Sequence, residues 1–278
     1  MKHIVSMRWL LARLYEPDLV IVDCRFKLGA PEAGRSAYEA GHLPRAVYLD
    51  LERDLSGPLG EHGGRHPLPE PSVLAQRLSA AGIGASSRVV AYDDQGGAMA
   101  ARLWWLLRYL GHEQAYVLEQ GYTAWTEAGF PITTEQPVVV PAAFAARVQP
   151  DMLVRAEEVR DRLGRSGTTL IDSRERPRYL GEVEPIDPVA GHIPGARNDF
   201  WGEAKHPDGT WKSPEEQRAR FAGLSETDEL IVYCGSGVTA TPNVLTLSEA
   251  GFTNVKLYAG SWSDWISYSD NPIATGEK

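Results

Sequence analysis

Short runs of apolar, often β-branched residues alternate along the chain with windows of helical periodicity. The apolar runs lie at Val20–Val22, Arg88–Ala91 and Ala115–Leu118, and the helical windows lie at Pro71–Ala81, Met99–Leu110 and Tyr122–Ala128. Continuous apolar runs separated by helices are typical of strands that are buried on both faces of a parallel sheet. Glycine follows the helical windows where a left-handed C-cap is expected, as at Gly82 and Gly111. The pattern therefore predicts an α/β fold, with ligand sites at the carboxyl ends of the strands.

The two halves of the chain repeat the same motifs in the same order. The matched pairs are Asp23–Arg25 with Asp172–Arg174, Gly41–Ala46 with Gly191–Ala196, Val89–Asp93 with Leu230–Cys234, and Gly121–Trp125 with Ser261–Trp265. The offset is 149 to 150 residues early in the chain and 140 to 141 residues later. Four ordered matches indicate a tandem duplication. We expect two parallel-sheet domains, residues 1–135 and 151–278, joined by a proline-containing linker at residues 136–150.

The change in offset comes from a loop that is longer in the first copy. Gly57–Pro67 is rich in glycine and proline and also carries charged and imidazole side chains, whereas the second copy is leaner around Lys205–Pro214. Long irregular loops in a small domain are more often functional than idle. The loop therefore becomes a candidate part of a site.

Charge and cysteine content exclude several classes of protein. The chain has 28 Lys and Arg against 37 Asp and Glu, a formal net charge of −9, which argues against a nucleic-acid partner because phosphate binding needs clustered cations. Two cysteines by themselves can form neither a disulfide framework nor a tetrahedral thiolate metal site. Every apolar run is interrupted before it reaches membrane-spanning length, and the first residues do not resemble a signal peptide. We expect a cytoplasmic protein with no membrane partner.

One cysteine lies where chemistry is expected. Cys234 follows the apolar run Leu230–Tyr233 and precedes Gly235–Ala240 (GSGVTA), after which Thr241 and Pro242 open a helical window. Glycines let several N–H groups of such a loop converge, and a helix N-terminus adds positive potential. This environment favours the thiolate, which is the reactive species. The alternative, that Cys234 is a small buried hydrophobe, is the common fate of a lone cysteine and is our interpretation of Cys24.

Together these motifs resemble the two-domain rhodanese-type sulfurtransferases, in their mercaptopyruvate form. The resemblance rests on the Cys234–Ala240 loop, on Gly191–Ala196, on Asp172–Arg174 and on the segment Tyr258–Trp262, and it spans essentially the whole chain. In that family the C-terminal domain is catalytic and the N-terminal domain has lost its cysteine. Asp93 stands at the position of Cys234 in the first copy, in agreement with that pattern.

The resemblance implies covalent sulfur transfer without a metal or organic cofactor. Cys234 would attack the sulfur of a small donor, 3-mercaptopyruvate or thiosulfate, and leave a persulfide that is held by the loop amides. The substrate-binding loop residues are Gly235, Gly237, Val238 and Thr239. Cyanide, a small thiol or thioredoxin would then remove the outer sulfur.

Donor recognition is assigned by the same resemblance to Arg178, because a guanidinium binds a carboxylate or sulfonate with a planar fork. Arg176 is a neighbouring alternative. The mercaptopyruvate enzymes carry a second arginine where this chain has Ile186, and this difference weakens the assignment of 3-mercaptopyruvate as the donor. Thiosulfate-preferring animal enzymes carry an Arg-Lys pair after the cysteine, where this chain has Gly235 and Ser236. The donor therefore stays open.

A relay to Ser236 is the last feature that the resemblance implies. His66, in the long loop, matches a family histidine that reaches the serine two residues after the cysteine, and Glu52 matches its acidic partner. The competing interpretation is a loop histidine with local bonds only. His42 and His192 recur in both copies although only one copy has the nucleophile, so we interpret both as structural.

Two other functions compete with sulfur transfer by turnover. A tyrosine or dual-specificity phosphatase would need an arginine six positions after the cysteine, and that position is Ala240. A persulfide-relay module that serves a dedicated protein partner is compatible with the same loop.

Overall fold

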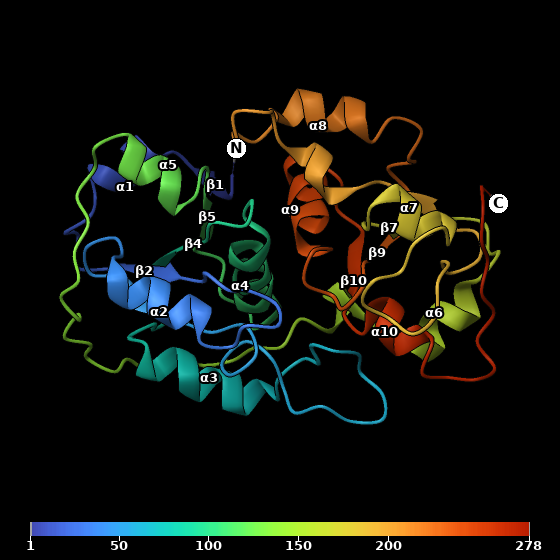
Figure 1. Cartoon of the computed structure of the whole chain (residues 1–278), viewed down its shortest axis with the longest axis horizontal. Helices are drawn as coiled ribbons and strands as arrows, with labels where there is room; N and C mark the ends of the chain where they lie inside the picture. Colours follow the sequence, from blue (N-terminus) through green and yellow to red (C-terminus); the bar gives the residue numbers. More distant parts are fainter. Residues whose placement is uncertain (1, 278) are drawn as a thin grey trace. The chain divides into compact units, whose positions relative to one another are not determined.

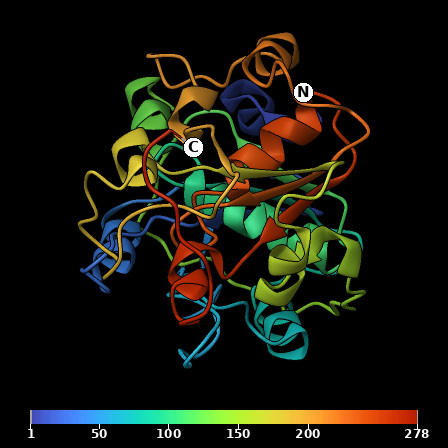
Figure 2. The same cartoon turned by 90° about the vertical axis from the view of Figure 1, so that its right-hand side faces the viewer.

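The computed structural model describes residues 2–277, which its contacts divide into two units. Unit 1 consists of residues 2–57, 69–149 and 207–211, and unit 2 of residues 58–68, 150–206 and 212–277. Figure 1 labels their elements and colours the chain from blue at the N-terminus to red at the C-terminus, and Figure 2 gives a second view. The long loop at residues 58–68 thus belongs to the unit that contains Cys234.

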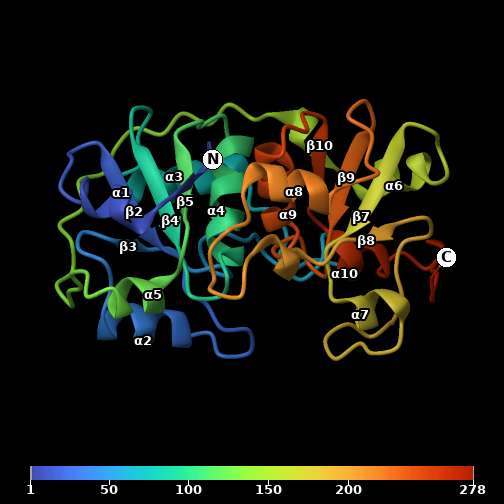
Figure 3. The same cartoon turned by 90° about the horizontal axis from the view of Figure 1, so that it is seen from above.

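Unit 1 is built on a five-stranded parallel sheet with the order β1-β5-β4-β2-β3 (Figure 3). Its strands are β1 (Ile4–Val5), β2 (Leu19–Asp23), β3 (Val47–Tyr48), β4 (Arg88–Tyr92) and β5 (Ala115–Leu118). Its helices are α1 (Met7–Leu11), α2 (Ala33–Ala40), α3 (Pro71–Ala80), α4 (Ala98–Tyr109) and α5 (Tyr122–Glu127). The predicted helical windows therefore end within one residue of the observed helices.

Unit 2 repeats this topology with the parallel order β6-β10-β9-β7-β8. Its strands are β6 (Leu153–Val154), β7 (Thr168–Asp172), β8 (Arg197–Asn198), β9 (Glu229–Tyr233) and β10 (Val255–Tyr258). Its helices are α6 (Ala156–Arg162), α7 (Arg176–Leu180), α8 (Pro214–Arg220), α9 (Thr241–Glu249) and α10 (Ser261–Trp265), with 3-10 turns η1 (Pro150–Met152) and η2 (Trp201–Ala204). The prediction of two α/β domains with parallel sheets is confirmed.

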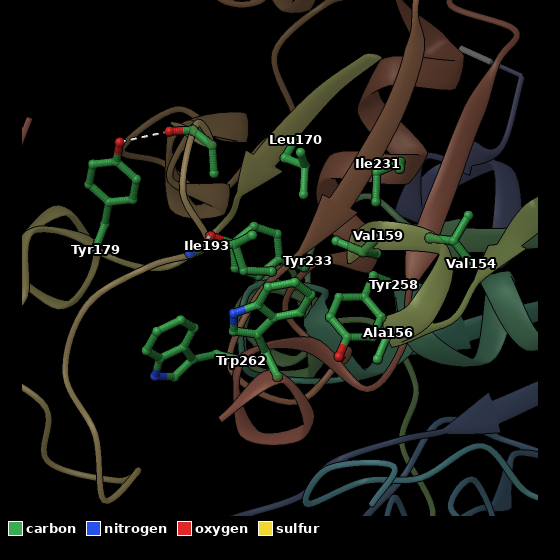
Figure 4. Packing of buried hydrophobic residues seen from close by; sticks show 12 residues of the cluster. Val154, Ala156, Val159, Leu170, Tyr179, Ile193, Ile231, Tyr233, Tyr258 and Trp262 are labelled. Carbon is green, nitrogen blue, oxygen red and sulfur yellow. Dashed lines mark hydrogen bonds between the residues drawn. The ribbon is translucent and has the colours of Figure 1, made fainter. Parts of the chain in front are cut away.

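The side chains of β9 point alternately to the two faces of the unit 2 sheet, and both faces are covered. Ile231 and Tyr233 point into a buried cluster that also contains Val159 of α6, Tyr179 of α7 and Trp262 of α10 (Figure 4). Successive side chains of a strand point to opposite faces, so Leu230 and Val232 face the other side, where α9 packs against β9 and β10. Burial on both faces is the reason that the strand reads as one continuous apolar run.

Equivalent residues form the core of unit 1. Tyr38, Tyr92 and Trp125 are buried there at the positions that Tyr179, Tyr233 and Trp265 occupy in unit 2. The two histidines that recur in the sequence behave alike as well. The Nδ1 of His42 lies 2.8 Å from the carbonyl oxygen of Tyr38, and that of His192 lies 2.7 Å from the carbonyl oxygen of Tyr179. A carbonyl can only accept, so both Nδ1 atoms carry a proton in a structural bond.

The remaining whole-chain features concern linkers, membranes and metals. Residues 136–149 contain neither helix nor strand, but the domain boundaries given above stay a prediction. None of the helices in residues 2–277 has the length and apolar character needed to cross a membrane. In the same residues no group of three or more His, Cys, Asp or Glu side chains is arranged to hold a metal ion.

Candidate active site

Cys234 lies immediately after β9 and is fixed through its backbone. Its N–H donates to the Ser261 Oγ at 3.1 Å, and its carbonyl oxygen accepts from the N–H of Trp262 at 3.0 Å. Both partners belong to α10, so this short helix holds the end of the strand. The cysteine is 1% exposed, which restricts any reaction partner to one that presents a small reacting atom.

The loop after Cys234 turns tightly into α9. Gly237 has φ +74°, and a Cβ at that position would lie 2.0 Å from the carbonyl oxygen of Ala259, so only glycine fits. The carbonyl oxygen of Val238 accepts from the Thr241 hydroxyl at 2.7 Å and closes the turn. Within residues 2–277 no protein acceptor is found for the backbone N–H groups of Ser236, Val238 and Ala240. These amides are therefore available to an anion.

The structure brings His66 and Ser236 together. The His66 Nδ1 lies 2.8 Å from the Ser236 Oγ, and both residues are buried. The segment that carries His66 is anchored on α10, with the Gly63 N–H donating to Asp264 at 2.6 Å and the Arg65 N–H donating to the Ser263 Oγ at 3.1 Å. A loop that is anchored at several points positions an imidazole more precisely than an unanchored loop does.

Glu52, the acidic residue of the predicted relay, lies in unit 1, whereas His66 belongs to unit 2. The Glu52 side chain is exposed, and its backbone N–H donates to the Oδ1 of Asp50 at 2.8 Å. Asp50 is itself buried and accepts from the Tyr48 hydroxyl at 3.0 Å. The catalytic role of Glu52 stays a prediction.

Arg178 lies against the loop, and its orientation is set by carboxylates. Its Nη2 donates to Glu184 at 2.7 Å and to Asp187 at 3.2 Å. Burial raises the pKa of Glu184, but hydrogen bonds from Arg178 and from the backbone N–H groups of Asp187 and Ile186 outweigh burial and hold that pKa below its ordinary value. Arg176 instead forms an exposed ion pair with Glu277.

A second arginine that our sequence reasoning did not single out lies beside Arg178. Arg65 precedes His66 in the long loop, and its Nη1 pairs with the Oδ1 of Asp187. A Cβ on Gly235 would be 3.0 Å from the Arg65 Nη2 and 3.5 Å from the Arg178 Nη2. The sequence signal for Arg65 was its place next to the candidate histidine. No sequence pattern indicates the direction in which the Arg65 side chain points.

The counterpart of Cys234 in unit 1 is chemically different. The Asp93 carboxylate accepts four backbone N–H groups, two from its own loop (Gln95 and Gly97) and two from the first turn of α4 (Met99 and Ala100), at 2.8 to 2.9 Å. The other cysteine, Cys24, is 1% exposed, and burial together with the neighbouring Asp23, Asp93 and Asp54 raises the pKa of its thiol well above the ordinary value. Cys24 is thus held in its unreactive protonated form.

Known proteins match this arrangement along the whole chain. The model of the rhodanese-like domain matches twice, at residues 6–128 and 155–268. A probable 3-mercaptopyruvate sulfurtransferase of Pseudomonas aeruginosa is 46% identical over 280 residues, which cover 99% of each chain. A putative thiosulfate sulfurtransferase of Mycobacterium tuberculosis is 38% identical over 261 residues, which cover 92% of this chain and 90% of the relative.

A solved structure agrees with both sequence matches. The crystal structure of SseA from Escherichia coli, described as a 3-mercaptopyruvate sulfotransferase with the rhodanese fold, superposes with a TM-score of 0.81 at 32% identity, covering 95% of this chain and 100% of that one. The resemblance inferred from the motifs is confirmed by these matches. The chain belongs to the two-domain rhodanese-type sulfurtransferases.

Proposed function

We propose that this protein transfers sulfur from 3-mercaptopyruvate to a thiol or cyanide through a persulfide on Cys234. The observation that carries the proposal is the loop after β9, where a cysteine is followed by amides that have no protein acceptor in the described chain. Such amides stabilise an anion that forms on the sulfur, and they cost no reorganisation when it forms. The names of the relatives from Pseudomonas aeruginosa and Escherichia coli support the same donor.

In the first step the Cys234 thiolate attacks the sulfur of the donor. An S–S bond forms while the bond between that sulfur and its methylene carbon breaks, and the electron pair of the broken bond goes to the carbon. The resulting enolate takes up the proton that the donor sulfur carried, which yields pyruvate and the persulfide anion. The Ser236 hydroxyl, 2.8 Å from His66, would stabilise the charge that develops on the keto oxygen of the donor.

In the second step an acceptor attacks the outer sulfur of the persulfide. Cyanide leaves as thiocyanate, a thiol leaves as its own persulfide, and in either case Cys234 returns as the thiolate, which closes a ping-pong cycle. We propose small thiols and thioredoxin as acceptors in a reducing cytoplasm. Both cysteines are unpaired in the described residues, in keeping with such a compartment.

Thiosulfate is the second candidate donor. The relative from Mycobacterium tuberculosis is named for it, and the arginines beside Gly235 can bind a sulfonate as well as a carboxylate. Thiosulfate lacks a keto group, so Ser236 has no developing enolate to stabilise with this donor. A relay to a dedicated protein partner uses the same persulfide and differs only in the acceptor.

The decisive experiment measures kcat/KM for both donors side by side, with cyanide as the common acceptor. We expect 3-mercaptopyruvate to exceed thiosulfate by about tenfold or more, because the Ser236 contribution is available to it alone. A higher value for thiosulfate would reassign the donor. Persulfide formation that is followed by no turnover with cyanide or small thiols would favour the relay.

A further inference from the structure

Backbone N–H groups hold the loop that carries His66 on α10. The Gly63 N–H donates to the Oδ1 of Asp264 at 2.6 Å, and the Arg65 N–H donates to the Ser263 Oγ at 3.1 Å. The two donors lie only three residues and one residue before the histidine in the chain. The position of the imidazole therefore depends on the acceptors that α10 offers to these two N–H groups.

Neighbouring loop residues lie on the same part of unit 2. Gly64 has φ +76°, and a Cβ at that position would lie 2.4 Å from the carbonyl oxygen of Gly260. The His62 ring stacks on Tyr268 with the ring centroids 3.9 Å apart, and its Nδ1 lies 2.7 Å from the Ser267 Oγ. The loop therefore runs along α10 and the residues on either side of that helix.

Apolar packing by itself does not fix this loop. A cavity of about 280 Å³ lies beside it, lined in part by Gly63 and Leu68 of the loop and by Tyr258 and Asp264. Leu59, at the start of the loop, is 75% exposed. Hydrophobic attraction has no direction, and a void next to a segment deprives it of contacts on that side. Directed polar bonds therefore decide where the loop lies.

The Asp264 carboxylate is the buried acceptor of this anchor. It is 5% exposed, and both of its oxygens accept from neutral donors: Oδ1 from the Gly63 N–H and Oδ2 from the Tyr258 hydroxyl, each at 2.6 Å. Burial and the neighbouring carboxylate raise the pKa of Tyr258, so its hydroxyl keeps the proton that it donates. A Cβ on Gly260 would lie 2.2 Å from Oδ2, so the carboxylate has little room to turn away.

Unit 1 has apolar residues at the matching positions. Leu118 stands where unit 2 has Tyr258, and Ala124 stands where it has Asp264, both at an offset of 140 residues. The residue after Ala124 and the residue after Asp264 are tryptophans that are fully buried in their units. The packing of this short helix therefore does not require the hydroxyl and the carboxylate, and the loop supplies a reason for both.

We propose that Asp264 is a positioning residue for sulfur transfer, which fixes the loop so that the His66 imidazole stays on the Ser236 hydroxyl. The proposal rests on the proposed function, because the position of His66 matters only where Ser236 acts on the donor. Asp264 acts through the loop and takes no part in making or breaking bonds. Tyr258 holds one carboxylate oxygen and thereby aims the other at Gly63.

Trypsin tests the anchor directly, because the peptide bond after Arg65 lies within the anchored segment and is cut only when that segment leaves α10. We expect Asp264→Ala to be cut there about tenfold or more faster than wild type, because two charge-assisted bonds are lost. Asp264→Asn should lie between the two, since its amide has one acceptor oxygen. Mass spectrometry identifies the cut, and cleavage elsewhere in the chain, which reports global unfolding, should not change.

Asp270→Ala is the matched control, because this carboxylate follows α10 in the same segment and is exposed. It should be cut after Arg65 at the wild-type rate. A wild-type rate for Asp264→Ala as well would overturn the proposal.

Activity tests the link between the anchor and Ser236. At saturating donor, with cyanide as acceptor, Asp264→Ala should lower kcat about tenfold for 3-mercaptopyruvate and stay within about twofold for thiosulfate, which has no keto group for Ser236 to act on. In a Ser236→Ala background the same change should lower kcat no further, because both substitutions remove one contribution. Losses that add in the double variant, or that are equal for both donors, would indicate general damage and overturn the positioning role.

The two levels of proposal fail in different ways. If wild type transfers sulfur and Asp264→Ala keeps the wild-type kcat with 3-mercaptopyruvate, the positioning role is overturned and the proposed function stands, whatever trypsin shows. If donor-treated wild type gains no sulfur mass on Cys234, the proposed function falls and the catalytic role of Asp264 falls with it. If Asp264→Ala does not fold, Asp264→Asn replaces it and the same directions of change apply.

Discussion

The loop after β4 and the loop after β9 occupy the same place in two copies of one fold. They differ in whether the backbone N–H groups of the turn have a protein acceptor. In unit 1 the Asp93 carboxylate accepts the N–H groups of Gln95, Gly97, Met99 and Ala100. In unit 2 the amides that correspond to the first three belong to Ser236, Val238 and Ala240 and have no protein acceptor in residues 2–277.

The same strand–loop–helix turn therefore presents converging backbone N–H groups in both units. Converging amides attract an anion whatever the chemistry of the domain. A carboxylate supplied by the loop itself satisfies them permanently and stabilises the fold. In the proposed mechanism a cysteine leaves them available for a persulfide that forms and disappears during the catalytic cycle, so that one copy would provide stability and the other chemistry.

The largest effect is expected at Cys234. Cys234→Ser should reduce sulfur transfer with either donor by about a thousandfold or more, because the hydroxyl is too weak a nucleophile to take up the sulfur. Steady-state rates and the mass of the donor-treated protein measure this, since wild type should gain the mass of one sulfur atom and the variant none. Cys24→Ser is the control, and it should leave the rate unchanged because Cys24 is buried in unit 1.

A graft of the cysteine into the unit 1 loop tests whether the turn is sufficient for sulfur transfer. The double variant Cys234→Ser/Asp93→Cys should stay as inactive as Cys234→Ser, because Ala37 and Gln95 stand at the positions that Arg178 and Ser236 occupy in unit 2. Transfer by the double variant would show that a cysteine on this turn is sufficient by itself, which contradicts the role given to the surrounding residues.

The next largest effect concerns the stability of unit 1. Asp93→Ala leaves four amides of the loop and of the first turn of α4 without their carboxylate, and we expect the free energy of unfolding to fall by about 3 kcal/mol. Denaturant unfolding measures it, with exposed Asp151→Ala as the control. A loss no larger than that of the control would mean that the carboxylate is not needed to stabilise the turn.

A smaller effect is expected at Ser236. Ser236→Ala should lower kcat with 3-mercaptopyruvate by about a hundredfold and should affect thiosulfate much less, because only the former develops an enolate. The ratio of the two kcat values checks the assignment. Gln95→Ala, the same change in the unit 1 loop, should leave both values as they are; equal losses for the two donors in Ser236→Ala would contradict the relay.

The smallest effect is a pH dependence of stability. The pKa of Glu184 lies below its ordinary value of 4.5, so the pairing with Arg178 contributes stability that is fully present above that value and is lost as the pH falls through the lower folded-state pKa. Glu184→Gln should therefore flatten the decline in unfolding free energy below about pH 5. Exposed Glu182→Gln should leave the decline unchanged, and an identical slope in both variants would rule out the linkage.

The elements and their topology could be predicted because they depend on local patterns. A strand buried on both faces must be apolar throughout, so β4 and β9 read as continuous runs. The repeat of tyrosine and tryptophan positions then fixed the same core in both units. The site was predictable to the extent that parallel strands present their carboxyl ends to ligands, which pointed to Cys234.

Local patterns in the sequence were sufficient to predict two parallel-sheet domains and the one cysteine that follows a strand and precedes a glycine loop. Which distant side chains meet at that loop depends on the folded chain. Arg65 and His66 reach it because Gly63 and Arg65 bond to residues 201 and 198 positions further along the chain. Periodicity records how each segment is buried, but the docking of a loop depends on complementary partners far away in sequence, and no local pattern carries that information.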